Sequence, residues 1–194
     1  MESLVLKIIF LIGVALLNII RMPHQRANKQ NVVVDDRKTA QEKGLLFLVF
    51  LGAFVLPLIY IFTPWLNFAN YFLPVWANIL GMMIFAIALW LFWRSHHDLG
   101  RNWSPTLQVR ADHTLITQGI YQTIRHPMYT SIWLLGIAQG LLLTNWIAGL
   151  SGMIAFGTLY FARIGNEENM MIEQFGDQYQ AYMQKTKRLL PYLF

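Results

Sequence analysis

Long apolar runs are the feature of this sequence that most constrains its fold. Three of them, 3–20, 44–63 and 74–93, are each about as long as the roughly 20 residues that a helix needs to cross the hydrocarbon of a bilayer. A backbone surrounded by lipid must satisfy its hydrogen bonds internally, so these runs are expected to cross as helices. With 56% hydrophobic residues overall, the chain is predicted to be an integral membrane protein.

A longer apolar stretch, 128–163, is expected to cross the membrane twice. It exceeds the length of one crossing, and the polar pair Thr144 and Asn145 interrupts it. A helical hairpin with spans 128–144 and 145–163 follows from this pattern. The predicted fold is therefore all-α, with about five transmembrane helices in a single membrane domain, 1–194. The first run is expected to be a membrane span, not a cleaved signal peptide, because its positive cluster follows the apolar core.

The distribution of positive charge predicts an orientation. Of 15 Lys and Arg residues, all except Lys7 lie in the three segments 21–43, 94–125 and 163–188. Five crossings place these segments on one side, and loops kept in the cytoplasm are rich in Lys and Arg. We therefore expect the N-terminus outside and the C-terminus, with parts 94–127 and 164–194, in the cytoplasm. The basic residues flank apolar runs, so membrane lipids rather than nucleic acid are the expected partner of the net charge of +5.

The residue types present exclude several kinds of chemistry. The sequence has no Cys, which rules out disulfides, Cys-ligated zinc, iron–sulfur clusters and a thiol nucleophile. His96, His97 and His113 do not have the spacing of a zinc motif, so no metal site is predicted. No G-x-G-x-x-G follows a strand pattern, and a Rossmann nucleotide site is therefore not indicated either.

The stretch GIYQTIRHPMYTS, 119–131, places Arg125, His126 and Pro127 directly before an apolar run. Proline suits the first turn of a helix and disfavours helical geometry in the residue before it, so a helix is expected to begin here. The positive end of that helix, with Arg125 beside it, would attract a carboxylate or phosphate. The alternative is that Arg125 and His126 are only an interfacial anchor of the span.

A second group of charges lies where the last span is expected to leave the membrane. Arg163 and Glu167 are four residues apart and would share one helix face, with Glu168 adjacent. As an exposed structural pair they would contribute only about 0.3–0.5 kcal/mol. Ionisable groups near membrane depth are costly and are often functional, and an Arg fork is suited to gripping a carboxylate. Farther on, 167–183 is expected to be an amphipathic helix with a bend at Gly176.

Several motifs in one order give the C-terminal half a family resemblance. From about His96 onward the chain resembles the isoprenylcysteine carboxyl methyltransferase family of integral membrane enzymes, and its length and span number are similar to those of the small archaeal-type members. The pieces that carry the resemblance are HTLITQGIY at 113–121, RHPMY at 125–129, Arg163 with Glu167 and Glu168, and FGDQY at 175–179 followed by Tyr182, Arg188 and Pro191. The pattern R-H-P-x-Y-x-G departs at its last position, where Ser131 stands, and this bears on the fit of the substrate.

The resemblance implies an enzyme that transfers a methyl group from S-adenosylmethionine to the C-terminal carboxylate of a prenylated cysteine, or to a similar lipid-borne carboxylate, with S-adenosylhomocysteine as product. Arg163 and Glu167 would be catalytic, Arg163 by orienting the substrate and Glu167 by contacting the cofactor near its reacting end. By position in the motifs, the cofactor would be lined by Gln108, His113, Leu115, Ile116, Tyr121, His126, Pro127, Met128, Tyr129 and Glu167.

Three other functions remain open at this point. A phospholipid-amine methyltransferase would need a base, for which Glu167 or Glu168 would serve, whereas an ionised carboxylate acceptor needs none. Sterol-reductase-type membrane enzymes carry a similar His-Pro-x-Tyr and would bind NADPH. In a non-catalytic membrane protein, Arg163 and Glu167 would be only an anchoring pair.

Overall fold

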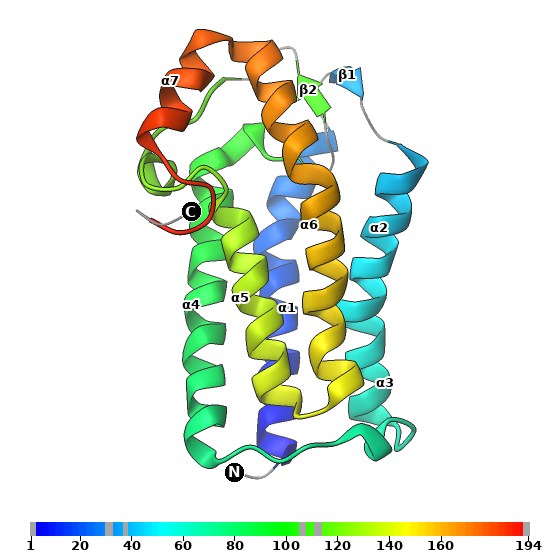
Figure 1. The fold of residues 1–194 in the computed structure, drawn as a ribbon. Helices are drawn as coiled ribbons and strands as arrows, with labels where there is room; N and C mark the ends of the chain where they lie inside the picture. The colour runs from blue at the N-terminus through cyan, green and yellow to red at the C-terminus, as the bar shows by residue number, and fades with distance from the viewer. Residues whose placement is uncertain (1–2, 30–32, 37–38, 105–107, 111–113, 192–194) are drawn as a thin grey trace.

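The computed structural model describes residues 3–29, 33–36, 39–104, 108–110 and 114–191, with the backbone alone at 29, 33–36, 101 and 108–110. In these residues the chain is a bundle of long helices that run side by side (Figure 1). The elements are α1 (Ser3–Lys29), α2 (Ala40–Phe50), a π-helical turn (Leu51–Val55), α3 (Leu56–Phe62), α4 (Val75–Leu99), α5 (Pro127–Leu143), α6 (Trp146–Phe175) and α7 (Asp177–Lys185), with short 3₁₀ turns at Asn67–Ala69, Gly100–Asn102 and Gly119–Gln122.

Four helical segments in the described residues are long and apolar enough to cross a membrane. They are Ser3–Asn28, Ala40–Phe62, Val75–Leu99 and Trp146–Phe175, and the 17-residue helix α5 is a shorter apolar one. At 1.5 Å per residue, α5 extends about 25 Å, close to the thickness of the hydrocarbon layer. The predicted helical membrane architecture is confirmed, with four long spans and α5 as a shorter fifth.

Three helices extend beyond the spans predicted from the apolar runs, and α4 is one of them, because it continues past residue 93 to Leu99. α1 continues past residue 20 to Lys29 with Pro23 inside it, and α6 continues past residue 163 to Phe175. Hydropathy reports where a span leaves the membrane, but a helix ends only where its backbone is interrupted. For α6 that interruption is Gly176, whose φ of 52° lies in a region favoured by glycine. The predicted bend at Gly176 is therefore present, and α7 follows it.

The hairpin predicted at Thr144 and Asn145 is also present. Thr144 is left-handed with a φ of 45°, and the side chain of Asn145 accepts hydrogen bonds from the backbone N–H groups of Ile147 and Ala148 at the start of α6. α5 and α6 then pack closely at their small residues. A Cβ atom added at Gly149 would lie 3.2 Å from the Cα atom of Gly140, so the two backbones nearly touch.

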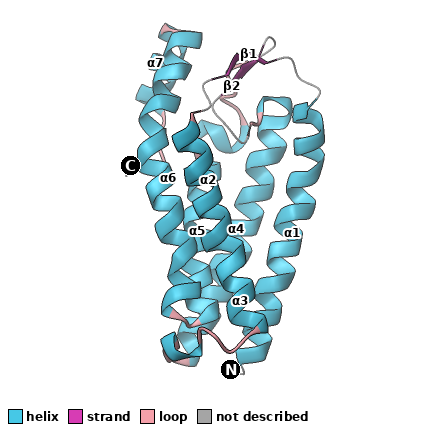
Figure 2. Ribbon diagram, turned by 90° about the vertical axis from the view of Figure 1, so that its right-hand side faces the viewer, coloured by secondary structure: helices cyan, strands magenta, loops and turns pink. Residues whose placement is uncertain are grey.

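A two-stranded antiparallel sheet was not predicted from the sequence. β1 (Val33–Asp36) pairs with β2 (Gln108–Arg110), two segments that are far apart along the chain (Figure 2). Each strand is too short to show an alternating pattern of its own, and the pairing depends on α1 and α4 bringing the two loops together. The sheet lies at the end of the bundle that also carries α7.

The C-terminal segment after α7 turns back onto the beginning of α5. Backbone N–H groups of Arg125 and His126 donate to the carbonyls of Lys187 and Arg188, at 2.7 and 3.0 Å. The hydroxyl of Thr130 donates to the carbonyl of Leu189 at 2.7 Å. This segment therefore covers the start of α5 at the end of the bundle where the polar residues gather.

Candidate active site

The cavity that we call the principal cavity, because most of the site residues line it, lies at this same end of the bundle. Its walls come from five of the long helices, from α7, and from the segment between α4 and α5. Among its lining residues are Arg21, Leu46, His96, Asn102, Trp103, Leu115, Ile116, Tyr121, Arg125, His126, Met128, Tyr129, Phe156, Arg163, Glu167, Met170, Tyr179 and Tyr182.

Most of the residues singled out from the sequence line this cavity. They are Leu115, Ile116, Tyr121, His126, Met128, Tyr129, Arg163 and Glu167. Pro127 is fully buried as the first residue of α5 and supports the turn without lining the cavity. His113 lies outside the described residues, and so does the side chain of Gln108, whose backbone belongs to β2.

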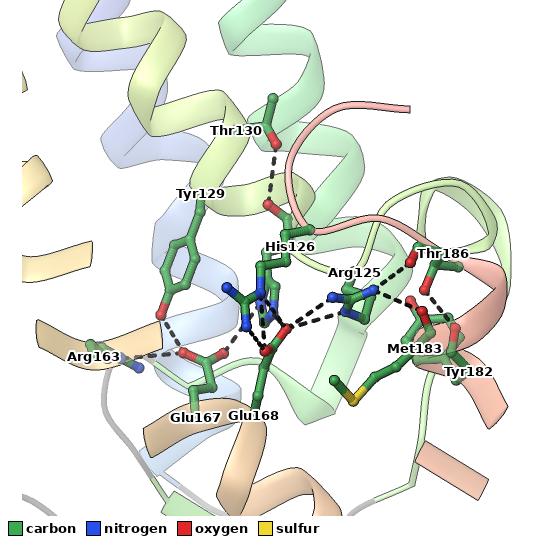
Figure 3. Close-up of polar contacts among 11 residues, drawn as sticks. Arg125, His126, Tyr129, Thr130, Arg163, Glu167, Glu168, Tyr182, Met183 and Thr186 are labelled. Atoms are coloured by element: carbon green, nitrogen blue, oxygen red, sulfur yellow. Dashed lines mark hydrogen bonds and ion pairs between the residues drawn. The ribbon is translucent and has the colours of Figure 1, made fainter. Parts of the chain in front are cut away.

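Glu167 is surrounded by polar groups from two helices. The hydroxyl of Tyr129 on α5 donates to its Oε2 atom, and Nε of Arg163, one turn earlier on α6, lies 3.4 Å from the same oxygen. Nδ1 of His126 lies 3.8 Å from Oε1 (Figure 3). The predicted i, i+4 contact between Arg163 and Glu167 is thus present, and the start of α5 is held against it.

Glu168 is the centre of an ion-pair network that shares His126 with Glu167. Arg125 places both Nε and Nη2 at 3.2 Å from Oε1 of Glu168, and Nε2 of His126 is 3.4 Å from the same atom. Arg188 donates through Nε to both carboxylate oxygens, at 3.0 and 3.1 Å. This contact raises the pKa of the Arg188 guanidinium, mainly through the hydrogen bond to Glu168. Figure 3 shows the carboxylate of Glu168 facing Arg125 and His126.

The network changes the interpretation of Arg125. The sequence suggested that Arg125 could receive an anionic group of a ligand at the start of α5. In the structure its Nη1 donates to the carbonyls of Met183 and Thr186, and its other nitrogens face Glu168. Arg125 therefore fastens α7 and the C-terminal segment to α6, while it also lines the cavity.

Glu42, at the start of α2, is a site residue that the sequence did not reveal. Its carboxylate Oε1 lies 3.2 Å from Nη1 of Arg163. The two residues are 121 positions apart in the sequence, so no local spacing could indicate the contact. The available hint was that Glu42 lies two residues before the apolar run 44–63, where ionisable groups near membrane depth are often functional.

The ion-paired groups in the described part of this site match in number. Three glutamates, Glu42, Glu167 and Glu168, face three arginines, Arg125, Arg163 and Arg188. Burial of charges is tolerated when each has an opposite partner, so this arrangement can persist at the membrane surface. Arg21, whose guanidinium lies over the ring of Trp103, adds a further positive charge to the lining of the cavity.

Aromatic residues complete another part of the cavity wall. The hydroxyl of Tyr182 on α7 donates to the backbone carbonyl of Tyr121 at 2.6 Å, which fixes the turn Gly119–Gln122 against α7. Burial raises the pKa of Tyr182 to about 12 and raises that of Tyr121 well above its usual value. Both hydroxyls therefore stay neutral and act as hydrogen-bonding groups at physiological pH.

His96 on α4 is buried in the wall of the cavity. Its Nδ1 atom is 2.9 Å from the carbonyl of Phe92, while its Nε2 atom has no hydrogen-bond partner within the described ranges of the chain. The ring packs against that of Trp103, at 4.9 Å between centroids, and Trp103 in turn donates to the sulfur of Met128 at 3.1 Å. A buried ring nitrogen of this kind is a ready partner for a polar group of a ligand.

The fold and the site together define a polytopic α-helical membrane protein with a charged, partly aromatic cavity at the basic end of its bundle. Residues 79–173 of the chain match the isoprenylcysteine carboxyl methyltransferase (ICMT) family. That segment contains α5 and most of α4 and α6, and with them Arg125, Arg163, Glu167 and Glu168, whereas Arg21, Glu42 and Arg188 lie outside it. The resemblance indicated by the motifs is thereby confirmed.

Individual proteins give the same result. The protein-S-isoprenylcysteine O-methyltransferase of Homo sapiens is 28% identical over 140 residues, which are 68% of this chain and 49% of the human protein. The enzyme of the same name from Schizosaccharomyces pombe is 32% identical over 80 residues, 41% of this chain and 34% of that protein. The chain thus spans half or less of the length of these curated relatives.

A solved structure shows that the fold is shared. The structure of the eukaryotic intramembrane Ras methyltransferase ICMT superimposes with a TM-score of 0.55 at 23% sequence identity, covering 82% of this chain and 55% of that one. At this level of identity the similarity establishes the arrangement of helices, and the chemistry must be argued from the residues of this chain.

Proposed function

We propose that the protein is a membrane methyltransferase that uses S-adenosylmethionine to methylate the carboxylate of a prenylated cysteine or a similar lipid-borne acid. The observation that carries the proposal is the placement of Arg163 and Glu167 side by side in the wall of one cavity. A guanidinium suits a carboxylate acceptor, and a carboxylate suits a cationic donor. The family match and the names of the relatives support the same reaction.

The residues of the cavity fit the proposed cofactor. The Nε2 atom of His96 is a buried polar atom without a partner among the described residues, and a hydrogen-bonding group of a ligand would satisfy it. Tyr121 and Trp103 offer aromatic surface for an adenine, and Glu167 offers negative charge for the cationic end. We assign the same cofactor-binding role, by motif position, to Gln108, His113, Leu115, Ile116, His126, Met128 and Tyr129, with Pro127 shaping the turn. When bound, S-adenosylmethionine supplies an activated methyl group on a sulfonium.

The protein's own part in the reaction is positioning. An acceptor carboxylate is ionised at neutral pH, so it needs orientation rather than deprotonation. Arg163 would hold it, and Tyr129 keeps Glu167 in place by donating to it. Effective transfer requires the reacting atoms to be held about 3–3.5 Å apart with water excluded. The buried aromatic and aliphatic walls of the cavity serve that exclusion.

The ion pairs of the site favour a carboxylate acceptor over a phospholipid amine. An amine must lose a proton, and Glu167 or Glu168 would have to accept it. Glu168 is held by Arg125 and Arg188, and Glu167 accepts from Tyr129 beside Arg163. The hydrogen bonds and charges around Glu168 lower the pKa of its carboxyl to about 2, so it is a poor base.

The polar end of the bundle is proposed to face the cytoplasm, with the N-terminus outside. In the structure the ends of α1, α4 and α6 that carry Arg21, Arg94 and Arg163 lie at the same end of the bundle as α7 (Figure 1). The rule that cytoplasmic segments are rich in Lys and Arg supports this orientation. Reporter fusions to the N- and C-termini would test it.

Calorimetric titration of the detergent-purified protein with S-adenosylhomocysteine tests the cofactor assignment. We expect binding in the micromolar range that His126→Ala weakens, and no binding of NADPH. Methyl transfer from labelled cofactor to an N-acetylated prenylcysteine, compared with its carboxamide and with an amino-phospholipid, tests the acceptor. We expect methyl transfer to the carboxylate alone. The pH dependence of its rate should not show the deprotonation of an amine. Binding of NADPH instead, or transfer to the amine, would refute the proposal.

A further inference from the structure

A second cavity lies between α2 and α6, and its polarity changes along its length. Leu45, Leu159 and Ala162 form its apolar part, while Gln41, Asn166, Asn169 and Glu173 form its polar part, with Thr39, Glu42 and Arg163 as further lining residues. Arg163 also lines the principal cavity. Arg163 therefore lies at the junction of the two cavities, at the level where the lining of the second cavity changes from apolar to polar side chains.

Glu42 and Arg163 form a buried ion pair at this junction. Nη1 of Arg163 is 3.2 Å from Oε1 of Glu42, and the side chains are 10% and 7% exposed. Arg163 thus receives two carboxylates from two helices, because Glu167 of α6 lies beside its Nε atom at 3.4 Å. Two anchors at different nitrogens restrict the plane of a guanidinium more than either one alone.

The position of Glu42 is built into the start of α2. The hydroxyl of Thr39 accepts a hydrogen bond from the backbone N–H of Glu42 at 3.0 Å, which places the glutamate in the first helical turn. One turn later, α2 packs against α6 through apolar side chains. Those of α2 are Leu45, Leu46 and Val49, and those of α6 are Phe156, Leu159, Tyr160 and Ile164.

We propose that Glu42 is a positioning residue for the methyl acceptor. Its carboxylate holds the guanidinium of Arg163 at the junction of the two cavities, in the orientation that receives the acceptor carboxylate. This inference rests on the proposed function and adds to it a residue that lies outside the segment matched by the family, 79–173. Because the pair joins α2 to α6, the packing of these two helices would determine the geometry of the acceptor site.

Other roles for Glu42 predict different results. If the pair only stabilised the fold, its loss would lower the melting temperature and leave the kinetics of the folded protein unchanged. If Glu42 competed with the acceptor for Arg163, its neutralisation would lower the KM for the acceptor. As a positioning residue, Glu42 should affect the acceptor and leave cofactor affinity unchanged, because its contact with the site is through Arg163.

The test compares Glu42→Ala, Glu42→Gln and the control Lys43→Gln, which changes an exposed charge on the same turn of α2. We expect Glu42→Ala to lower kcat/KM for a prenylcysteine acceptor by about 10- to 100-fold, the scale reported for misplacement of reacting groups by about 1 Å. Glu42→Gln, which keeps a hydrogen-bond acceptor, should recover part of that loss. Binding of S-adenosylhomocysteine to each folded variant, and all properties of Lys43→Gln, should match wild type.

A second measurement identifies Arg163 as the residue through which Glu42 acts. In the background of Arg163→Lys, the further change Glu42→Gln should lower kcat/KM much less than it does in wild type, because contacting residues are coupled. Equal effects in both backgrounds, unchanged kinetics in Glu42→Ala, or a lowered acceptor KM would each overturn the inference while the proposed function stands. A wild-type protein without methyl transfer to the acceptor would refute the proposed function and this inference with it.

Discussion

Replacing Glu168 by Gln should destabilise the protein more than any other change of a single charge at the site. Glu168 is the shared partner of Arg125 and Arg188, and the side chains of Glu168 and Arg125 are only 5% and 8% exposed. Removing one partner of a buried ion pair typically costs about 3–5 kcal/mol, because the other charge stays buried without compensation. For a chain of this size that corresponds to a melting temperature lower by about 6–20 °C.

Thermal unfolding of the detergent-purified protein, followed by tryptophan fluorescence, measures this effect. Glu173→Gln on the same helix is the matched control, since Glu173 is exposed and its loss should change stability by less than about 0.5 kcal/mol. The two arginines should also differ. Arg125→Ala should cost more than Arg188→Ala, because the Arg188 side chain is 38% exposed and is partly solvated. If Glu168→Gln had the same melting temperature as the Glu173→Gln control, the idea of a buried stabilising network would be refuted.

Three further predictions concern the site and its framework. Arg163→Ala should abolish most turnover while cofactor binding persists, and Glu167→Ala should weaken the binding of S-adenosylhomocysteine. Calorimetry and initial rates measured on both variants distinguish these effects. Wild-type values in both variants would contradict the site assignment. Tyr182→Phe should cost about 1 kcal/mol at neutral pH through the lost hydrogen bond to Tyr121. Burial raises the pKa of Tyr182 from 10.0 to about 12, so the contribution of its neutral hydroxyl to stability is complete below pH 10 and is lost between pH 10 and 12. The melting temperature measured across pH 9–12 should therefore fall less steeply in Tyr182→Phe than in wild type. Gly149→Val should separate α5 from α6 and lower the melting temperature, since its Cβ would lie 3.2 Å from the Cα of Gly140. Gly165→Ala should be tolerated, because a Cβ added there would meet no atom within 4 Å apart from the neighbouring backbone of its own helix.

The sequence predicted the parts of the site that depend on short-range rules. Pro127 begins α5 and Gly176 ends α6, as their backbone preferences require. Arg163 and Glu167 meet because residues four apart share a helix face. The motif residues that line the cavity were also named in advance, because the family resemblance links residues that local chemistry alone does not connect.

The partners of Arg125 within the protein are far from it along the chain. Seen locally, Arg125 is a cation at the positive end of a helix, and an incoming anion is its natural partner. In the folded protein that anion is Glu168, 43 residues later, and two carbonyls of the C-terminal segment take the remaining nitrogen. Nothing in the local sequence shows that the chain end returns to this position.

The sequence by itself determined that this chain is a helical membrane protein, where its spans lie and which residues resemble a methyltransferase motif. Those properties follow from hydrophobic length, helix caps and spacings of a few residues. Only the tertiary structure decided that Glu42 reaches Arg163, that Glu168 joins two arginines and that β1 pairs with β2. The physical reason is that these contacts depend on which faces of distant helices pack together, and side-chain packing between helices is not encoded in the periodicity of either helix alone.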